Sequence, residues 1–199
     1  MVESPRRQQI EDAASALFRE RGYAATSVRD IAKALNLQGG SLYAHVASKE
    51  DVLWSIVARA ADRFNREVGP LAANEAPAPT RLREMIRAHV AVVTSAQKDA
   101  AVFLDEWRFL SLERREQVAA RRDAYEAMFR HAIADGIQTG VFCAVDVRIT
   151  ATAILSALNG IAAWYRVDGS LSPDEIADSY ADLFLRAVHE PHFMTRTIT

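Results

Sequence analysis

Cysteine and long apolar runs are scarce in this chain of 199 residues. Cys143 is the only cysteine, so the chain cannot form an internal disulfide or a zinc site built from several cysteines. Apolar runs stay short of the ~20 residues that span a bilayer, and the N-terminus has no apolar signal region. These absences predict a soluble, cytoplasmic protein with no membrane contact.

The chain also lacks an excess of positive charge. The formal net charge is −2, and lysine occurs only at positions 33, 49 and 98. The chain therefore lacks the global basic field of non-specific nucleic-acid binders, and any contact with DNA must be local and geometric. Half of the residues are hydrophobic and a quarter are charged, which is typical of a globular chain of one or two domains.

Signals of catalysis and of metal binding are weak. No β pattern appears, so phosphate-binding loops lack their structural context, and no Ser or Cys nucleophile comes with a recognisable base. His131 with Asp135, and His189 with His192, are histidine groups that we expect to be solvated. The sequence predicts no enzyme activity, no metal site and no cofactor.

Apolar residues recur at spacings of three and four through most of the chain, which predicts helices. We expect Gly22 to close the first helix and Gly69-Pro70 to end the one that starts at Lys49. The predicted fold class is all-α, with a three-helix DNA-binding head and a helical body. The expected helices cover 4–21, 28–35, 38–45, 49–68, 81–96, 99–110, 111–136, 146–165 and 172–188.

The stretch 26–51 reads as two short helices joined by a tight turn at Asn36, which tolerates a left-handed backbone. In a helix-turn-helix the second helix lies in the major groove. Leu42 and Val46 are expected to face inward. Gly39 and Gly40 leave no bulk, which permits a close approach. Four side chains are left to point outward: Gln38, Ser41, Tyr43 and His45.

These residues resemble the DNA-binding signature of the TetR family of transcriptional regulators. The residues that carry the resemblance are Thr26, Val28, Ile31-Ala32, Leu35, Leu37, Gly40-Ser41-Leu42-Tyr43, His45 and Ser48-Lys49. Asn36 and Val46 depart from it, because the family usually has glycine and an aromatic residue there. A double-stranded DNA operator is the partner that the resemblance implies. Phosphates are assigned to Ser27, Arg29, Tyr43 and Lys49, and the base-facing side to Gln38, Gly39, Gly40, Ser41 and His45.

The segment 146–165 is apolar or small almost all round, so it must be covered on more than one side. Its small residues, Ala153, Ala157, Gly160 and Ala163, would allow a close helix approach. We expect a homodimer in which the last two helices of each subunit form a four-helix bundle. The alternative is a wholly intramolecular core. A dimer would read a palindrome, and the TetR resemblance implies the same dimer.

The body is rich in aromatic residues, most of which can be plain core. A mostly apolar pocket between its helices would suit a small effector, as the TetR resemblance implies. The pattern Glu106-Trp107…Leu110…Arg114…Arg122…Tyr125-Glu126 is similar to TetR relatives that control fatty-acid, phenylacetate or steroid breakdown, whose effectors are acyl-CoA thioesters. A neutral drug or flavonoid is the rival. The candidate ligand-binding residues are His89, Phe103, Trp107, Arg108, Tyr125, Phe129 and Asn159.

The sequence thus predicts a TetR-type repressor that leaves its palindromic operator when a small apolar effector binds. Residues 1–50 would form the DNA-binding domain, and residues 51–199 the ligand-binding and dimerisation domain. The alternative is a helical ligand carrier or enzyme that has kept a vestigial DNA-binding head.

Overall fold

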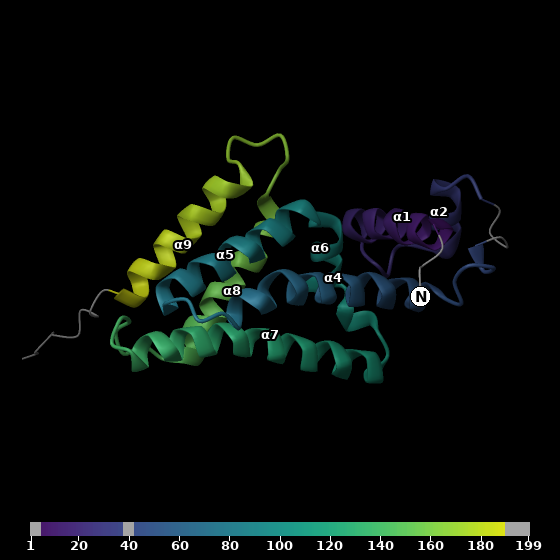
Figure 1. The fold of residues 1–199 in the computed structure, drawn as a ribbon. Coiled ribbons are helices and arrows are strands. Elements are labelled where there is room, and N and C mark those ends of the chain that lie inside the picture. The colour runs from purple at the N-terminus through teal and green to yellow at the C-terminus, as the bar shows by residue number, and fades with distance from the viewer. Residues whose placement is uncertain (1–4, 38–41, 190–199) are drawn as a thin grey trace, which may run out of the picture. The chain divides into compact units, whose positions relative to one another are not determined.

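The computed structural model describes residues 5–37 and 42–189, and within these ranges it is helical without strands (Figure 1). The all-α prediction is confirmed. The helices are α1 (Pro5–Arg21), α2 (Val28–Ala34), α4 (Lys49–Ala72), α5 (Ala78–Ser95), α6 (Gln97–Asp105), the 3₁₀ helix η1 (Trp107–Phe109), α7 (Leu112–Gln138), α8 (Val147–Trp164) and α9 (Pro173–His189).

Local capping residues set several helix ends where the sequence predicts them. Ser172 and Glu175 form a capping box at the start of α9, with Glu175 Oε2 accepting from the Ser172 amide at 2.8 Å. Asn36 has a φ of 54°, and Gly22 follows α1 with a φ of 82°. Both residues tolerate the left-handed backbone that stops a helix.

Several predicted helix bounds are wrong. The helix expected over 81–96 begins at Ala78, and the helix expected to stop at Gly136 continues to Gln138. We expected Gly69-Pro70 to end the helix that starts at Lys49, but α4 continues through Pro70 to Ala72. Pro70 lies in the last turn, where its missing N–H costs one hydrogen bond, and the Gly69 carbonyl still accepts from the Ala73 amide at 3.1 Å. The helix expected over 99–110 stops at Asp105, and η1 follows it.

The chain forms two compact units that do not follow its order. The first comprises the residues up to Arg63 together with Ala96–Arg122, and the second comprises Phe64–Ser95 with the residues from Asp123 onward. Helices α4 and α7 each contribute to both units. The domain boundary predicted at residue 50 stays a prediction.

In the first unit α1 packs against α2 and α6. Its fully buried side chains include Ile10, Phe18, Ile31, Leu42 and Leu53. Val46 is also buried, so the smaller side chain at this position still belongs to the core of the head.

In the second unit α5 packs against α8 and α9. Arginines of α5 pair with aspartates of α9: Arg83 Nη2 lies 2.6 Å from Asp182 Oδ1, and Arg87 contacts both Asp174 and Asp178. These exposed ion pairs fix the register of the two helices more than they stabilise the fold, because water screens them.

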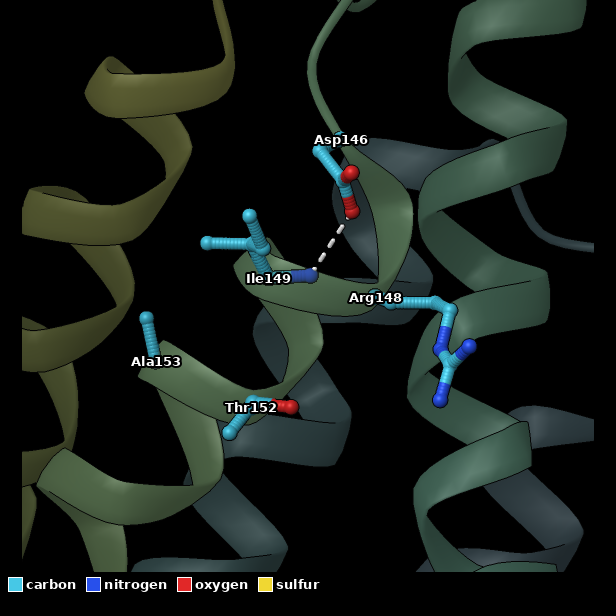
Figure 2. A pocket seen from close by; sticks show the side chains of 5 residues that line it. All are labelled: Asp146, Arg148, Ile149, Thr152 and Ala153. Carbon is cyan, nitrogen blue, oxygen red and sulfur yellow. Dashed lines mark hydrogen bonds between the residues drawn. The ribbon is translucent and has the colours of Figure 1, made fainter.

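The outer side of α8 is not covered by any of the residues that the structure describes. By length and composition α8 could cross a membrane, contrary to our expectation that no run would qualify, and 28% of this segment is buried. A surface hollow of about 570 Å³ is lined by five residues at its start, Asp146, Arg148, Ile149, Thr152 and Ala153 (Figure 2). Figure 2 shows Ile149 and Ala153 pointing to the opposite side of the helix from Arg148. Because its lining comes from one helix and its cap, this hollow is an open surface.

Candidate functional site

The structure describes the helix-turn-helix up to residue 37 and again from residue 42. Gln38, Gly39, Gly40 and Ser41, which we assigned to the base-facing side, lie outside the described residues. Beyond them Leu42 and Val46 are buried as predicted, while Tyr43 is 56% exposed. His45 is also exposed. The two outward side chains that are described are therefore accessible to a partner.

Ser27 and Arg29 stand at the start of α2, and both are exposed. Ser27 is the N-cap: its Oγ accepts from the Asp30 amide at 3.2 Å, and Asp30 Oδ2 accepts from the Ser27 amide at 2.8 Å. Hydrogen bonds from the Ser27 side chain and backbone hold the pKa of Asp30 below its usual range. Ser27 thus caps a helix whose N-terminus faces solvent.

Lys49 opens α4, and its ammonium group is held by the chain itself. Nζ donates to the carbonyls of Tyr23 at 2.9 Å and Thr26 at 2.8 Å, and it lies 4.0 Å from the centre of the Tyr23 ring. Partial burial lowers the pKa of Lys49. The predicted phosphate contact stays a prediction, and the structure adds a second role in which Lys49 fastens the loop between α1 and α2 to α4.

Acidic residues in the first turn of α4 contact the start of α7. Glu50 Oε1 accepts from the Ser111 amide at 3.0 Å, and Arg114 Nη2 donates to Asp51 Oδ1 at 2.5 Å. The pKa of Glu50 is lowered, first by the Ser111 hydrogen bond, and that of Asp51 is lowered, first by Arg114. Carboxylates also suit a helix N-terminus.

A third contact joins the loop after α1 to η1. Glu106 Oε2 accepts from the Tyr23 amide at 3.2 Å, and the Tyr23 and Phe109 rings stack with their centres 5.4 Å apart. Tyr23 therefore contacts Lys49 on one side and the α6–η1 segment on the other.

A buried ionic network links α1, α4 and α6. Glu11 is fully buried, and Arg59 Nη1 lies 2.8 Å from its Oε2. Arg59 Nε also donates to Asp99 Oδ2 at 3.0 Å, and Ser15 Oγ donates to Asp99 Oδ1 at 2.6 Å. Sequence reasoning missed this network. The feature of the sequence that could have indicated it is the pair Glu11 and Ser15, two polar residues four positions apart on the apolar side of the first helix.

Four of the seven candidate ligand-binding residues belong to the second unit, namely His89, Tyr125, Phe129 and Asn159. His89 Nδ1 lies 2.9 Å from Tyr125 Oη, and Phe64 stacks near His89 with the ring centres 4.8 Å apart. The Phe129 ring closes the group, 5.6 Å from that of Tyr125.

Burial controls the ionisation of this cluster. His89 is 2% exposed, and burial lowers its pKa to about 3, while the Asn159 amide acts in the opposite direction. Burial also raises the pKa of Tyr125. Both groups are therefore neutral at physiological pH.

The other three candidates, Phe103, Trp107 and Arg108, belong to the first unit. The Arg122 guanidinium lies 5.5 Å from the Phe103 ring centre and 5.3 Å from that of Trp107. Arg108 lies over Phe109. The predicted ligand-binding set is thus divided between the two units.

Two family models match the chain. The model described as "Bacterial regulatory proteins, tetR family" matches residues 10–56, and "Tetracyclin repressor-like, C-terminal domain" matches residues 75–188. The second model alone spans more than half of the sequence, and the first covers the helix-turn-helix.

Curated and solved relatives agree with this assignment. The HTH-type transcriptional repressor KstR2 of Rhodococcus jostii is 27% identical over 95% of this chain and 94% of its own length. The solved KstR2 of Mycobacterium tuberculosis, a ketosteroid transcriptional regulator, covers 94% of this chain and 97% of its own, with 26% identity and a TM-score of 0.89. AibR, solved with isovaleryl coenzyme A and operator DNA, covers 94% of this chain and 100% of its own, with 28% identity and a TM-score of 0.80. The chain belongs to the TetR family of bacterial transcriptional regulators.

Proposed function

We propose that this TetR-family repressor binds a palindromic operator as a homodimer in the cytoplasm and leaves it when an acyl-CoA thioester binds in the body. The observation that carries the proposal is that one chain matches both the DNA-binding and the C-terminal models of the family. The repressor relatives match across nearly their whole length, which disfavours a carrier or enzyme with a vestigial head.

DNA contact is proposed for the exposed side of the head. Arg29, Tyr43 and His45 are exposed, and Ser27 is exposed beside Arg29 at the start of α2. With a net charge of −2, affinity must come from such local groups in two heads together. Gln38, Gly39, Gly40 and Ser41 complete the proposed base-facing side.

Dimerisation is proposed for the outer sides of α8 and α9. Ile149 is 70% exposed and Leu183 is 60% exposed, and Trp164 also reaches solvent. Ala153 and Gly160 lie between Ile149 and Trp164 at helical spacing and are exposed. A second copy of this chain would cover these apolar side chains about a two-fold axis.

Release is proposed to pass through the two helices that both units share. α4 and α7 run from the unit that holds the aromatic cluster into the unit that holds the helix-turn-helix. There the Arg59–Glu11–Asp99 network and the Arg114 contacts tie them to α1 and to each other. An effector shifts this equilibrium only if it binds the DNA-incompetent geometry more tightly. The acyl-CoA class is proposed from AibR, which was solved with isovaleryl coenzyme A.

The test is selection of bound duplexes from a random pool by the purified protein, with and without isovaleryl-CoA and palmitoyl-CoA. We expect a palindrome, and its loss with one thioester. Arg29→Ala should weaken binding to any sequence and reduce the salt slope by about one, whereas Arg166→Ala, which removes an exposed arginine from the second unit, should do neither.

Each part of the proposal has its own contradicting result. An enriched sequence that lacks two-fold symmetry contradicts the dimeric operator. Retention of the palindrome with both thioesters contradicts the effector class and leaves the DNA-binding proposal standing. Absence of any enriched sequence at moderate salt favours the carrier or enzyme.

A further inference from the structure

The His89 imidazole has a hydrogen-bonding nitrogen that the protein leaves unused. His89 Nε2 is buried, and no residue in 5–37 or 42–189 makes a hydrogen bond with it. The Asn159 side chain is near enough for a hydrogen-bond contribution that raises the pKa of the ring, but the geometry at Nε2 is not that of a formed hydrogen bond. Leaving a buried polar atom unsatisfied costs about 1–3 kcal/mol, so such an atom needs an explanation.

The contact with Tyr125 decides which nitrogen of the neutral ring carries the proton. In the described part of the chain, the Tyr125 hydroxyl makes its hydrogen bond to His89 Nδ1, at 2.9 Å. Donation of the hydroxyl proton to Nδ1 satisfies both groups with one hydrogen bond, and it requires an unprotonated Nδ1. The ring proton therefore lies on Nε2, and the unused atom is a donor.

The side chains around this donor are apolar or neutral. Phe64 lies against the ring, Phe129 meets it edge-on with the centres 6.4 Å apart, and Tyr125 and Asn159 are its polar neighbours. Of these neighbours Asn159 alone is partly exposed, so it marks the side on which a ligand would approach. None of the five side chains carries a positive charge at neutral pH.

We propose that His89 Nε2–H binds the carbonyl oxygen of the effector's thioester, with Asn159 beside it as the second polar contact. This inference rests on the proposed function and names the chemistry of its site: an uncharged carbonyl on an apolar chain. A free carboxylate is rejected, because it would be buried without a cation and would lose its hydration. The protein then distinguishes an activated acyl group from the free acid.

The test compares two ligands that differ at one group. The best binder among isovaleryl-, octanoyl- and palmitoyl-CoA is measured by calorimetry against its thioether analogue, in which a methylene replaces the carbonyl. We expect the full-length protein to bind the thioester about tenfold more tightly than the thioether. The free fatty acid should bind more weakly still.

Variants assign this preference to His89. His89→Leu should bind thioester and thioether equally, and His89→Gln, whose side-chain amide can still donate, should recover part of the preference. Arg166→Ala, which removes an exposed arginine outside the candidate ligand-binding residues, should keep it in full. The ¹⁵N chemical shifts of the ligand-free His89 ring report its tautomer in the unmodified protein, and we expect the proton on Nε2.

The outcomes separate this inference from the proposed function. Equal binding of thioester and thioether by the unmodified protein overturns the role of His89 and leaves the acyl-CoA effector standing. A proton on Nδ1 overturns it as well. If no CoA compound binds, the effector class fails and the inference fails with it.

Discussion

His89 is a histidine whose burial makes the fold sensitive to acid. Its pKa in the folded protein is about 3, below the ordinary value of 6.5 that it regains on unfolding. Between these values the unfolded state binds a proton that the folded state does not, so stability rises with pH and falls as the solution is acidified. The carboxylates of Glu50 and Asp51 behave differently, because their lowered pKa values move the loss of stability to lower pH.

We therefore predict that the free energy of unfolding falls by about 1.4 kcal/mol for each pH unit below 6.5, or ~2 kcal/mol by pH 5. Asp51 and Glu50, whose pKa values are lowered, lose their contributions only below about pH 4.5. Urea unfolding from pH 7 to pH 5 measures the slope. His89→Gln should abolish most of it, and His131→Gln, at an exposed position, should not. A slope retained by His89→Gln would contradict the assignment.

Substitutions of Lys49 and Tyr43 should differ in their effect on stability, although both residues are predicted to contact phosphate. Lys49 Nζ donates to the Tyr23 and Thr26 carbonyls, whereas Tyr43 is exposed. We expect Lys49→Met to lower the free energy of unfolding by about 1–3 kcal/mol, because two carbonyls lose a charged donor. Tyr43→Phe should leave stability within about 0.5 kcal/mol of the unmodified protein. Urea titration measures both, and an unchanged stability for Lys49→Met would show that the ammonium does not hold this loop in solution.

One arginine, Arg59, links three helices of the first unit through its ion pairs. Arg59 of α4 contacts Glu11 of α1 and Asp99 of α6, and Glu11 is fully buried. We predict that Arg59→Met costs about 3 kcal/mol of unfolding free energy, because the buried Glu11 carboxylate loses its shorter ion pair and keeps the one with Arg7, at 3.1 Å. Arg121→Met, which breaks the exposed pair with Asp62, should cost less than about 1 kcal/mol.

The double variant Glu11→Gln with Arg59→Met separates charge from packing. It should recover a large part of the lost stability, since the uncharged amide no longer needs the guanidinium. Equal instability of the single and double variants would mean that Arg59 acts through packing of its side-chain carbons.

Element boundaries were predictable where a local residue decides them. Ser172, Asp146 and Asn36 set helix ends through their own side chain or backbone, and all three appear where the sequence places them. The predicted helix end at Pro70 was wrong because the effect of a proline depends on its distance from the end of the helix. The break after Asp105 has no local signal, since Glu106 there meets Tyr23, which is 83 residues away in sequence.

The sequence likewise predicted some features of the candidate site and not others. His89, Asn159 and Arg108 were identified from the sequence as rare polar residues of the body, and Tyr125 as one of its many aromatic residues. Their pairing could not be predicted, because His89 and Tyr125 are 36 residues apart and meet only through helix packing. The Arg59 network was missed because each of its charges reads as ordinary helix surface, and burial of Glu11 is a property of the folded unit.

At the scale of the whole molecule, the uncovered side of α8 decides how the chain assembles. Gly160 lies on this side, and a Cβ built on it meets nothing within 4 Å. In the isolated chain, Gly160→Leu should therefore be tolerated and should even gain about 0.8 kcal/mol from helix propensity. In the proposed dimer the same side chain would enter the closely packed helix contact about the two-fold axis.

We predict that Gly160→Leu weakens the dimer at least tenfold while each chain stays folded, and that operator affinity falls with it. Sedimentation equilibrium measures the association, and circular dichroism measures the fold. Gly69→Leu is the matched control, because a Cβ at Gly69 in α4 also meets nothing within 4 Å and lies outside α8 and α9. If Gly160→Leu remains a dimer of unchanged affinity, the two-fold contact lies elsewhere, and the exposed apolar side of α8 needs another partner.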